Sequence, residues 1–311
     1  MESVKPSFSE LFESTVVYPD PDMQDRLNLL VGLDDTKQKI RKILGLLINQ
    51  NGIQDWVNKY HKGANQILNF VTKRPPLIVL AGDVGSGKSE IAYTIGDAVA
   101  RQENLDIELF PLSLSTRGQG RVGQMTQLIS AAFEYTLERA KKLKSNNGKS
   151  RGAVILLVDE ADALAQSREN DQMHHEDKAG VNAFIRGIDS LGNGKLPAAV
   201  IMCTNRPNSL DPAIRRRAAE IIYFNRPSEE SRHHVLDNPL TELGFNQKEI
   251  QKIVDLTGPQ KNREFGFTFS DLVQRLIPSI VLDAYPNTSV HPARAIEITK
   301  TLIPTSPFKE I

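Results

Sequence analysis

The segment GDVGSGKS, at Gly82–Ser89, constrains the fold of this 311-residue chain more than any other feature. It fits the pattern G-x-x-x-x-G-K-[ST] and lies between an apolar run, Leu77–Ala81, and a helical pattern that starts at Ser89. Glycines let backbone N–H groups curve around phosphate oxygens, and the amino end of a helix adds free donors and a positive dipole end. The sequence therefore predicts a strand, a phosphate-binding loop and a helix in direct succession.

The predicted ligand of this loop is ATP with Mg²⁺. Lys88 is placed to reach the β- and γ-phosphates, and Ser89 is placed to offer its hydroxyl to Mg²⁺. The predicted nucleotide-binding residues of the loop and the first helical turn are Gly82, Asp83, Val84, Gly85, Ser86, Gly87, Lys88, Ser89 and Glu90.

Short apolar runs alternate with helical patterns on both sides of the loop. Continuous apolar strands separated by helices indicate a parallel sheet that is covered on both faces. The predicted strands are Leu77–Ala81, Ile107–Leu112, Ala153–Val158, Ala198–Thr204 and Glu220–Phe224, and the helices between them are Ser89–Arg101, Gln124–Lys142 and Val181–Leu191. Beyond Pro227 only helical patterns remain, at Glu229–Asp237, Gln247–Leu256, Phe269–Ala284 and Pro292–Leu302.

These patterns predict an α/β fold with a five-stranded parallel sheet and a smaller all-helical domain. Residues 1–26 are polar and rich in proline, so we expect a short flexible arm there. Residues 27–226 form the α/β domain, which begins with a helix capped by Asp34 or Asp35, and residues 227–311 form the helical domain.

Polar residues follow two of the apolar strands. Asp159 and Glu160 end the run Ala153–Val158, where a charged pair is costly unless it has a function. With the phosphate loop upstream, Asp159 is predicted to hold Mg²⁺ through water, and Glu160 to orient and polarise the attacking water. Asn205 follows the run Ala198–Thr204 and is predicted to lie near the γ-phosphate. Taken alone, Asn205 is more simply a turn residue before Arg206–Pro207.

The charge balance argues against two classes of partner. The chain has 38 Lys plus Arg and 38 Asp plus Glu, so no global attraction draws it to nucleic acid or to an anionic membrane. The single cysteine, Cys203, excludes an intramolecular disulfide, and no apolar run approaches the ~20 residues that span a bilayer. We therefore expect a cytoplasmic protein without a nucleic-acid or membrane partner.

From Leu27 to Leu302 the chain resembles the AAA+ superfamily. The resemblance is carried, in order, by GDVGSGKS, AVILLVDEADAL, CTNRP and LDPAIRRRAAEIIYF. It implies a large α/β domain, a helical lid and a ring, usually a hexamer, that binds nucleotide between subunits. It also implies residue roles: adenine contact for Val31 and Gly32, sensor 1 for Asn205, arginine fingers for Arg216 and Arg217, with Arg217 the main one, and sensor 2 for Arg294.

Within the superfamily, the segment VNAFIRGIDSL, the Arg217–Ala218 pair and the helix of Arg294 resemble the HORMA-remodelling branch. This branch contains the pachytene-checkpoint ATPases and their bacterial relatives in CBASS anti-phage operons. The resemblance implies a homohexamer that pulls on the N-terminal segment of a HORMA-domain protein and converts it from closed to open. That conversion would take the HORMA protein off a cyclic-oligonucleotide synthase, a nucleotidyltransferase, and damp signalling.

The resemblance also indicates two loops that line a central pore. The first has Arg121, Val122 and Gly123 where many relatives carry an aromatic residue, so we expect local remodelling rather than processive unfolding. The second lies within Ser167–Gly180 and includes His174 and His175, which we interpret as part of a polar pore loop rather than as a metal site.

Three other functions remain as alternatives. A general unfoldase or protease partner would normally carry a docking domain or a protease-binding motif, and we find neither. A DNA-directed AAA+ enzyme is disfavoured by the neutral charge. A scaffold that binds ATP without turnover is disfavoured by the intact set of catalytic residues.

Overall fold

The computed structural model describes residues 6–12, 14–114, 124–145, 150–165, 175–193, 196–261 and 263–308. The chain forms two compact units. The first consists of Met1–Asn28, Asp35–Ala81 and Ser89–Tyr223, and the second of Leu29–Asp34, Gly82–Lys88 and Phe224–Ile311. The phosphate loop, Gly82–Lys88, is therefore part of the second unit, together with the helices that follow Phe224.

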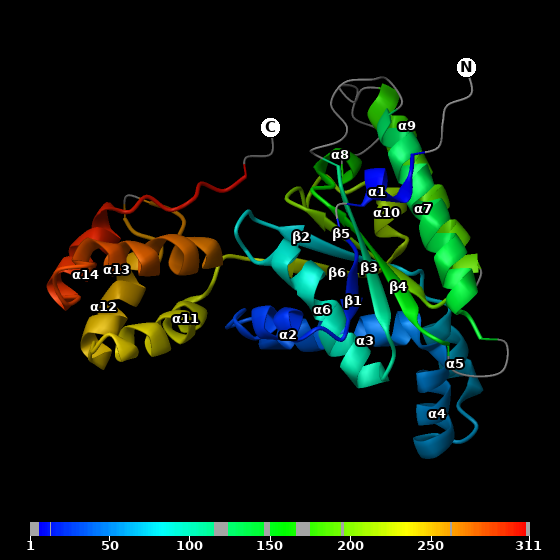
Figure 1. The fold of residues 1–311 in the computed structure, drawn as a ribbon, viewed down its shortest axis with the longest axis horizontal. Coiled ribbons are helices and arrows are strands. Elements are labelled where there is room, and N and C mark those ends of the chain that lie inside the picture. Colours follow the sequence, from blue (N-terminus) through cyan, green and yellow to red (C-terminus); the bar gives the residue numbers. More distant parts are fainter. Residues whose placement is uncertain are drawn as a thin grey trace. The chain divides into compact units, whose positions relative to one another are not determined.

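A six-stranded sheet with the order β1-β3-β4-β5-β2-β6 forms the centre of the first unit (Figure 1). Its strands include the five that the sequence predicts: β2 (Leu77–Gly82), β3 (Ile107–Ser113), β4 (Ala153–Asp159), β5 (Ala198–Thr204) and β6 (Ala218–Phe224). The pairs β3–β4, β4–β5 and β2–β5 are parallel, with Val154 opposite Ala198 and Leu80 opposite Cys203. The predicted α/β class is confirmed.

Both faces of the sheet are buried. Val154, Leu156 and Val158 of β4 pack in one core with α7 (Gln124–Leu143) and α9 (His175–Asn193), two long helices that run side by side (Figure 1). Ile155 and Leu157 alternate with them along the strand and are equally buried. Helices α3 (Asp34–Ile48) and α6 (Lys88–Glu103) bury further apolar residues of their own. Two covered faces explain why the strands appear as unbroken apolar runs.

The segment before Leu27 departs from the prediction. It forms α1 (Phe8–Leu11), β1 (Val16–Tyr18) and α2 (Pro21–Asn28), and β1 pairs antiparallel with β3. Leu11, Phe12 and Tyr18 are buried. For its described residues, the expectation of a flexible arm is therefore wrong, and the sheet has a sixth strand. A three-residue strand is too short to give a periodic signal, and proline-rich flanks hid it.

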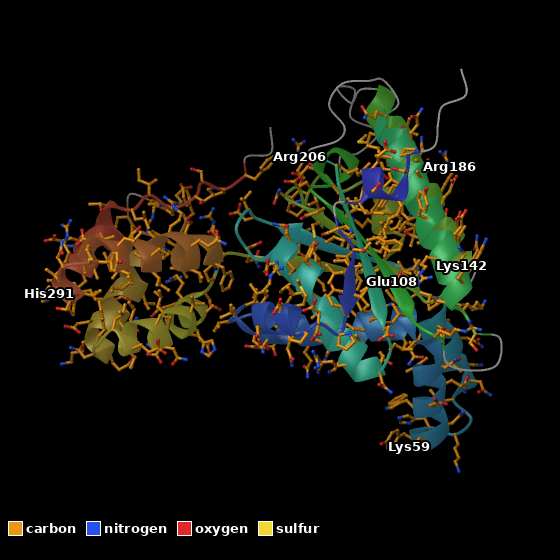
Figure 2. All side chains as sticks on the ribbon, viewed as in Figure 1. Lys59, Glu108, Lys142, Arg186, Arg206 and His291 are labelled. Carbon is orange, nitrogen blue, oxygen red and sulfur yellow. The ribbon has the colours of Figure 1, made fainter. Side chains whose placement is uncertain are left out.

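Four short helices complete the first unit: α4 (Gln50–Tyr60), α5 (Asn65–Thr72), α8 (Asp162–Ala165) and α10 (Pro212–Arg215). Helix α5 buries none of its residues. Lys59, labelled in Figure 2, lies near the end of α4. Within the described part of the chain, no helix is both long enough and apolar enough to cross a membrane.

The second unit contains the helices expected after Pro227. They are α11 (Glu229–Glu242), α12 (Gln247–Thr257), the π-helix η1 (Asp271–Leu276), α13 (Ile277–Ala284) and α14 (Pro292–Thr301). Leu236, Ile250 and Phe267 belong to their common core. The segment Phe269–Ala284, predicted as one helix, is divided into η1 and α13. Pro278 has no N–H to donate, which fits the wider turn that precedes it.

Candidate functional site

Lys88 lies inside the phosphate loop. Its side chain is 6% exposed, and its ammonium donates to the carbonyl oxygens of Gly82 (3.0 Å) and Asp83 (2.6 Å). It also lies 3.3 Å from the Ser86 hydroxyl. The loop thus curves around one buried positive charge at the start of α6, which is the arrangement that a phosphate-binding loop requires.

Two glycines of the loop have no room for a side chain. At Gly82, φ is +150°, and an added Cβ would collide with the carbonyl oxygen of Phe224. At Gly85, φ is +70°, and a Cβ would lie 2.8 Å from the Thr268 hydroxyl. Both positions need glycine for backbone conformation and for space. Within the second unit, the loop is therefore packed against Phe224, the last residue of β6, and against Thr268.

The two residues predicted to hold Mg²⁺ lie next to each other. The Ser89 hydroxyl donates to Oδ1 of Asp159, 3.1 Å away. The same Oδ1 accepts from the backbone N–H of Glu160 at 2.8 Å. Hydroxyl and carboxylate oxygens are the ligands that Mg²⁺ prefers, so this pair fits the ion.

Glu160 is exposed and has a left-handed backbone, with φ +53°. For a residue with a Cβ this conformation is uncommon and strained, and such residues gather at functional sites. The position fits the predicted role of Glu160 toward the attacking water.

Asn205 is fixed by a residue that the sequence reasoning missed. The carboxylate of Asp162 accepts from the Asn205 backbone N–H (2.7 Å) and from its side-chain Nδ2 (3.1 Å). It also accepts from the Thr204 hydroxyl at 2.9 Å. Asp162 comes only two residues after Glu160, in the sequence DEAD, and its position could have indicated a place near the site. Nothing in the sequence pattern indicated that it binds Asn205. Arg206, which follows Asn205, is labelled in Figure 2.

Three other predicted residues have partners of their own. Glu90 binds Arg26 of α2 through two hydrogen bonds of 2.8 and 2.9 Å. Gly32 has φ +80° and lies beside Phe269, and Val31 packs against the core of the second unit. These contacts leave the predicted adenine-binding role of Val31 and Gly32 as a prediction.

Arg294 is exposed on α14. Its guanidinium binds Asp283 at 3.0 Å and Glu297 at 3.0 Å, and the hydrogen bonds that it donates to Asp283 raise the pKa of Arg294. Among the described residues, neither of these partners belongs to the phosphate loop. The sensor-2 role of Arg294 remains a prediction.

The two candidate arginine fingers differ in their surroundings. Arg217 is held by Asp189 of α9 through two hydrogen bonds of 2.7 and 3.0 Å, which raise its pKa. Arg216 is exposed at the end of α10. The structure of one chain thus places Arg217 against its own α9 and leaves Arg216 at the surface.

The predicted pore-loop residues Arg121, Val122, Gly123 and His174 lie outside the described residues. His175 is the first residue of α9. Their roles stay predictions.

Comparison with known proteins identifies relatives over nearly the full length. The model of the ATPase family associated with various cellular activities (AAA) matches residues 78–226. CD-NTase-associated protein 6 of Escherichia coli strain MS 115-1 is 62% identical over 306 residues, which is 98% of each chain. The protein of the same name from strain KTE188 is 35% identical, over 98% of this chain and 100% of its own.

Comparison with solved structures identifies similar proteins. A chain in the structure titled HORMA:CdnC:Trip13 complex of E. coli MS115-1 is 60% identical, with a TM-score of 0.91 over 98% of this chain and 100% of that chain. A structure of Rhizobiales Trip13 is 54% identical, with a TM-score of 0.76 over 96% of this chain and 100% of that chain.

Proposed function

The chain belongs to the AAA ATPase family, in the group of CD-NTase-associated protein 6, and on this premise we propose that it is a ring-forming motor that remodels a HORMA-domain protein. Like its family, it binds nucleotide and is an ATPase. The observation that carries the proposal is the similarity, over nearly the whole of both chains, to a chain solved in a HORMA:CdnC:Trip13 complex.

The proposed hydrolysis uses Lys88 of the phosphate loop and the polar residues at the ends of β4 and β5. Mg²⁺, when bound, would neutralise negative charge on the phosphates. Ser89 would hold the ion through its hydroxyl and Asp159 through water, and Lys88 would bind the phosphates. Glu160 orients the attacking water and accepts its proton, while Asn205, held by Asp162, orients the reacting groups. Arg216 and Arg217 act from a neighbouring subunit, and Arg294 acts as sensor 2.

The proposed partner is a HORMA-domain protein whose N-terminal segment enters the pore of a homohexamer. Arg121, Val122 and Gly123 form the first pore loop, and His174 and His175 belong to the second. Opening the HORMA protein releases it from a nucleotidyltransferase and damps anti-phage signalling in the cytoplasm. We also propose that residues 27–226 form the large domain and residues 227–311 the helical lid. Support for the partner comes from the relatives, and support for ATP use comes from the site.

A pull-down tests this function. In the Glu160→Gln variant, ATP should bind but remain unhydrolysed, which keeps the ring in its substrate-bound state. Purified Glu160→Gln should retain a HORMA protein encoded near its own gene when ATP is present, and release it when ADP replaces ATP. Lys88→Ala, which loses its contact to the phosphates, is the matched control and should retain none. Equal retention by both variants would disprove nucleotide-gated capture.

A further inference from the structure

The phosphate loop contains an acidic residue, Asp83, at its second position. A carboxylate so close to a bound triphosphate repels it. At an effective dielectric constant of about 20, like unit charges several ångströms apart repel strongly enough to weaken binding about tenfold or more. A loop with this sequence therefore needs a compensating positive charge besides Lys88.

Arg226 supplies that charge. Its Nε donates to Oδ2 of Asp83 at 2.7 Å, and the side chains of Arg226 and Asp83 are only 14% and 17% exposed. Arg226 lies two residues after the end of β6. Because the pair is largely shielded from water, the two charges neutralise each other more completely than a surface pair does.

The other donors of Arg226 fix it in place. They bind the carbonyl oxygens of Gly266 (2.6 Å) and Thr305 (2.7 Å), and the guanidinium lies 4.8 Å from the centre of the Phe265 ring. These contacts come from two segments of the second unit, one at residues 265–266 and the other at Thr305. The guanidinium therefore has one orientation, in which a single donor remains directed at Asp83.

Asp271 links Thr305, which binds Arg226, to Ser270, which binds Gly85 of the phosphate loop. It accepts from both the N–H and the hydroxyl of Thr305, at 3.0 and 2.8 Å. Burial raises the pKa of Asp271, but hydrogen bonds from Thr268, Thr305 and Arg275 outweigh burial and hold the pKa below its ordinary value. The neighbouring Ser270 donates its backbone N–H to the carbonyl of Gly85 at 3.1 Å. The loop is thus held at both Asp83 and Gly85.

We propose that Arg226 is a positioning residue for nucleotide binding, which neutralises Asp83 and so keeps the phosphate loop receptive to a triphosphate. The backbone carbonyl of Asp83 accepts from Lys88, whereas its carboxylate accepts from Arg226 and from the Val84 N–H. Arg226 itself does not contact the nucleotide. The inference rests only on nucleotide binding and not on the HORMA partner.

The test is a charge-removal cycle in the full-length protein. The variants are Arg226→Gln, Asp83→Asn and the double variant, with dissociation constants for a fluorescent ATP analogue measured at low and high salt. Arg139→Gln removes an ion pair with Glu108 (labelled in Figure 2) outside the site and serves as the matched control. Thermal unfolding confirms that each variant is folded.

Arg226→Gln should weaken binding about tenfold or more at low salt and less at high salt, because salt screens the repulsion between the unneutralised Asp83 carboxylate and the triphosphate. The KM for ATP should rise while kcat stays within about threefold of wild type. Adding Asp83→Asn should restore affinity to within about threefold of wild type. Asp83→Asn alone removes the repelling carboxylate and should bind at least as tightly as wild type, whereas Arg139→Gln should stay within about threefold of wild type.

A double variant as weak as Arg226→Gln would overturn the proposal, since it would show that Arg226 acts through the carbonyls of Gly266 and Thr305. If Arg226→Gln does not fold, Arg226→Lys is measured instead. It keeps the positive charge, so its affinity for the ATP analogue should be within about threefold of wild type. A tenfold loss of affinity in Arg226→Lys would contradict the proposal. Wild-type protein that fails to bind the analogue would count against the nucleotide site itself.

Discussion

Asp162 illustrates at the scale of single residues how this site controls its catalytic side chains. Its carboxylate accepts three hydrogen bonds from Thr204 and Asn205, and so it fixes both the backbone and the side chain of Asn205, the proposed sensor. A polar side chain held this way keeps its geometry when the nucleotide changes. A displacement of 1 Å near the reacting atoms can lower the reaction rate about 10²-fold.

We therefore predict that Asp162→Ala lowers kcat for ATP by about tenfold or more and leaves nucleotide affinity within about threefold of wild type. The reason is that Lys88 and the loop remain intact while Asn205 loses its orientation. Steady-state ATPase kinetics, together with binding of a fluorescent ATP analogue, separate the two quantities. A loss of affinity as large as the loss of kcat would mean that Asp162 supports the fold of the site instead.

The residues of the site were predictable from sequence to different degrees. Lys88 and Ser89 stand in a motif whose spacing indicates its chemistry, and Asp159 and Glu160 were predicted because this motif precedes them. The structure places Ser89 beside Asp159 as expected. Arg226 was not predictable, because its partner Asp83 lies 143 residues earlier in the chain. No local pattern encodes a contact over that distance.

At the scale of elements, the edge strand β1 depends on one close approach. The fully buried ring of Tyr18 packs directly on Gly96 of α6, and the Tyr18 hydroxyl donates to the carbonyl oxygen of Tyr93. A Cβ at position 96 would collide with the ring. Because Gly96 has no side chain, α6 leaves room for the Tyr18 ring of the N-terminal segment.

Gly96→Ala should destabilise the protein, although alanine favours helices by up to ~1 kcal/mol over glycine. The collision with Tyr18 costs about 1–3 kcal/mol, as overpacking does in other cores. The midpoint of thermal unfolding should fall by a few degrees.

In a Tyr18→Ala background the collision is gone, so the same Gly96→Ala change should raise the midpoint. An increase in both backgrounds would show that β1 does not rest on α6 as described. Both comparisons use one heating rate, since unfolding of a large protein is often irreversible.

The elements themselves were predictable where burial imposed a pattern. The five strands with apolar runs and the helices α6, α7, α12 and α14 agree with the sequence prediction to within a few residues. Helix α9 begins six residues earlier than predicted, and β1, α1, α2, α4, α5, α8 and α10 were not predicted. Of these, β1 has only three residues, and α5 buries none of its side chains, so neither gives a clear apolar pattern. Helix α11 continues past Pro239 to Glu242, where the predicted helix had already ended. A proline removes one donor but does not prevent a helix that packing supports.

At the scale of the whole molecule, the proposed ring places an arginine of one subunit at the nucleotide of the next. The pairing of Arg217 with Asp189 makes the choice between Arg216 and Arg217 an experimental one. Fingers of this kind contribute roughly 10³–10⁵ in rate.

Arg217→Ala and Glu160→Gln should each be inactive alone. Mixed in one ring they should recover part of the ATPase activity, because some interfaces then combine an intact Glu160 with an intact Arg217. The same mixture with Arg216→Ala shows which arginine matters more. If neither mixture recovers activity although mixed rings form, the fingers do not act between subunits.

The proposed opening of a HORMA protein by ATP hydrolysis can be measured on a preformed complex of that protein with its nucleotidyltransferase. The complex is incubated with this ATPase and ATP, and the fraction that remains bound is measured by size-exclusion chromatography. Wild-type protein with ATP should dissociate the complex at substoichiometric amounts, whereas Glu160→Gln should leave it intact. Dissociation by Glu160→Gln at the same rate, or a complex that wild-type protein and ATP leave unchanged, would contradict the account.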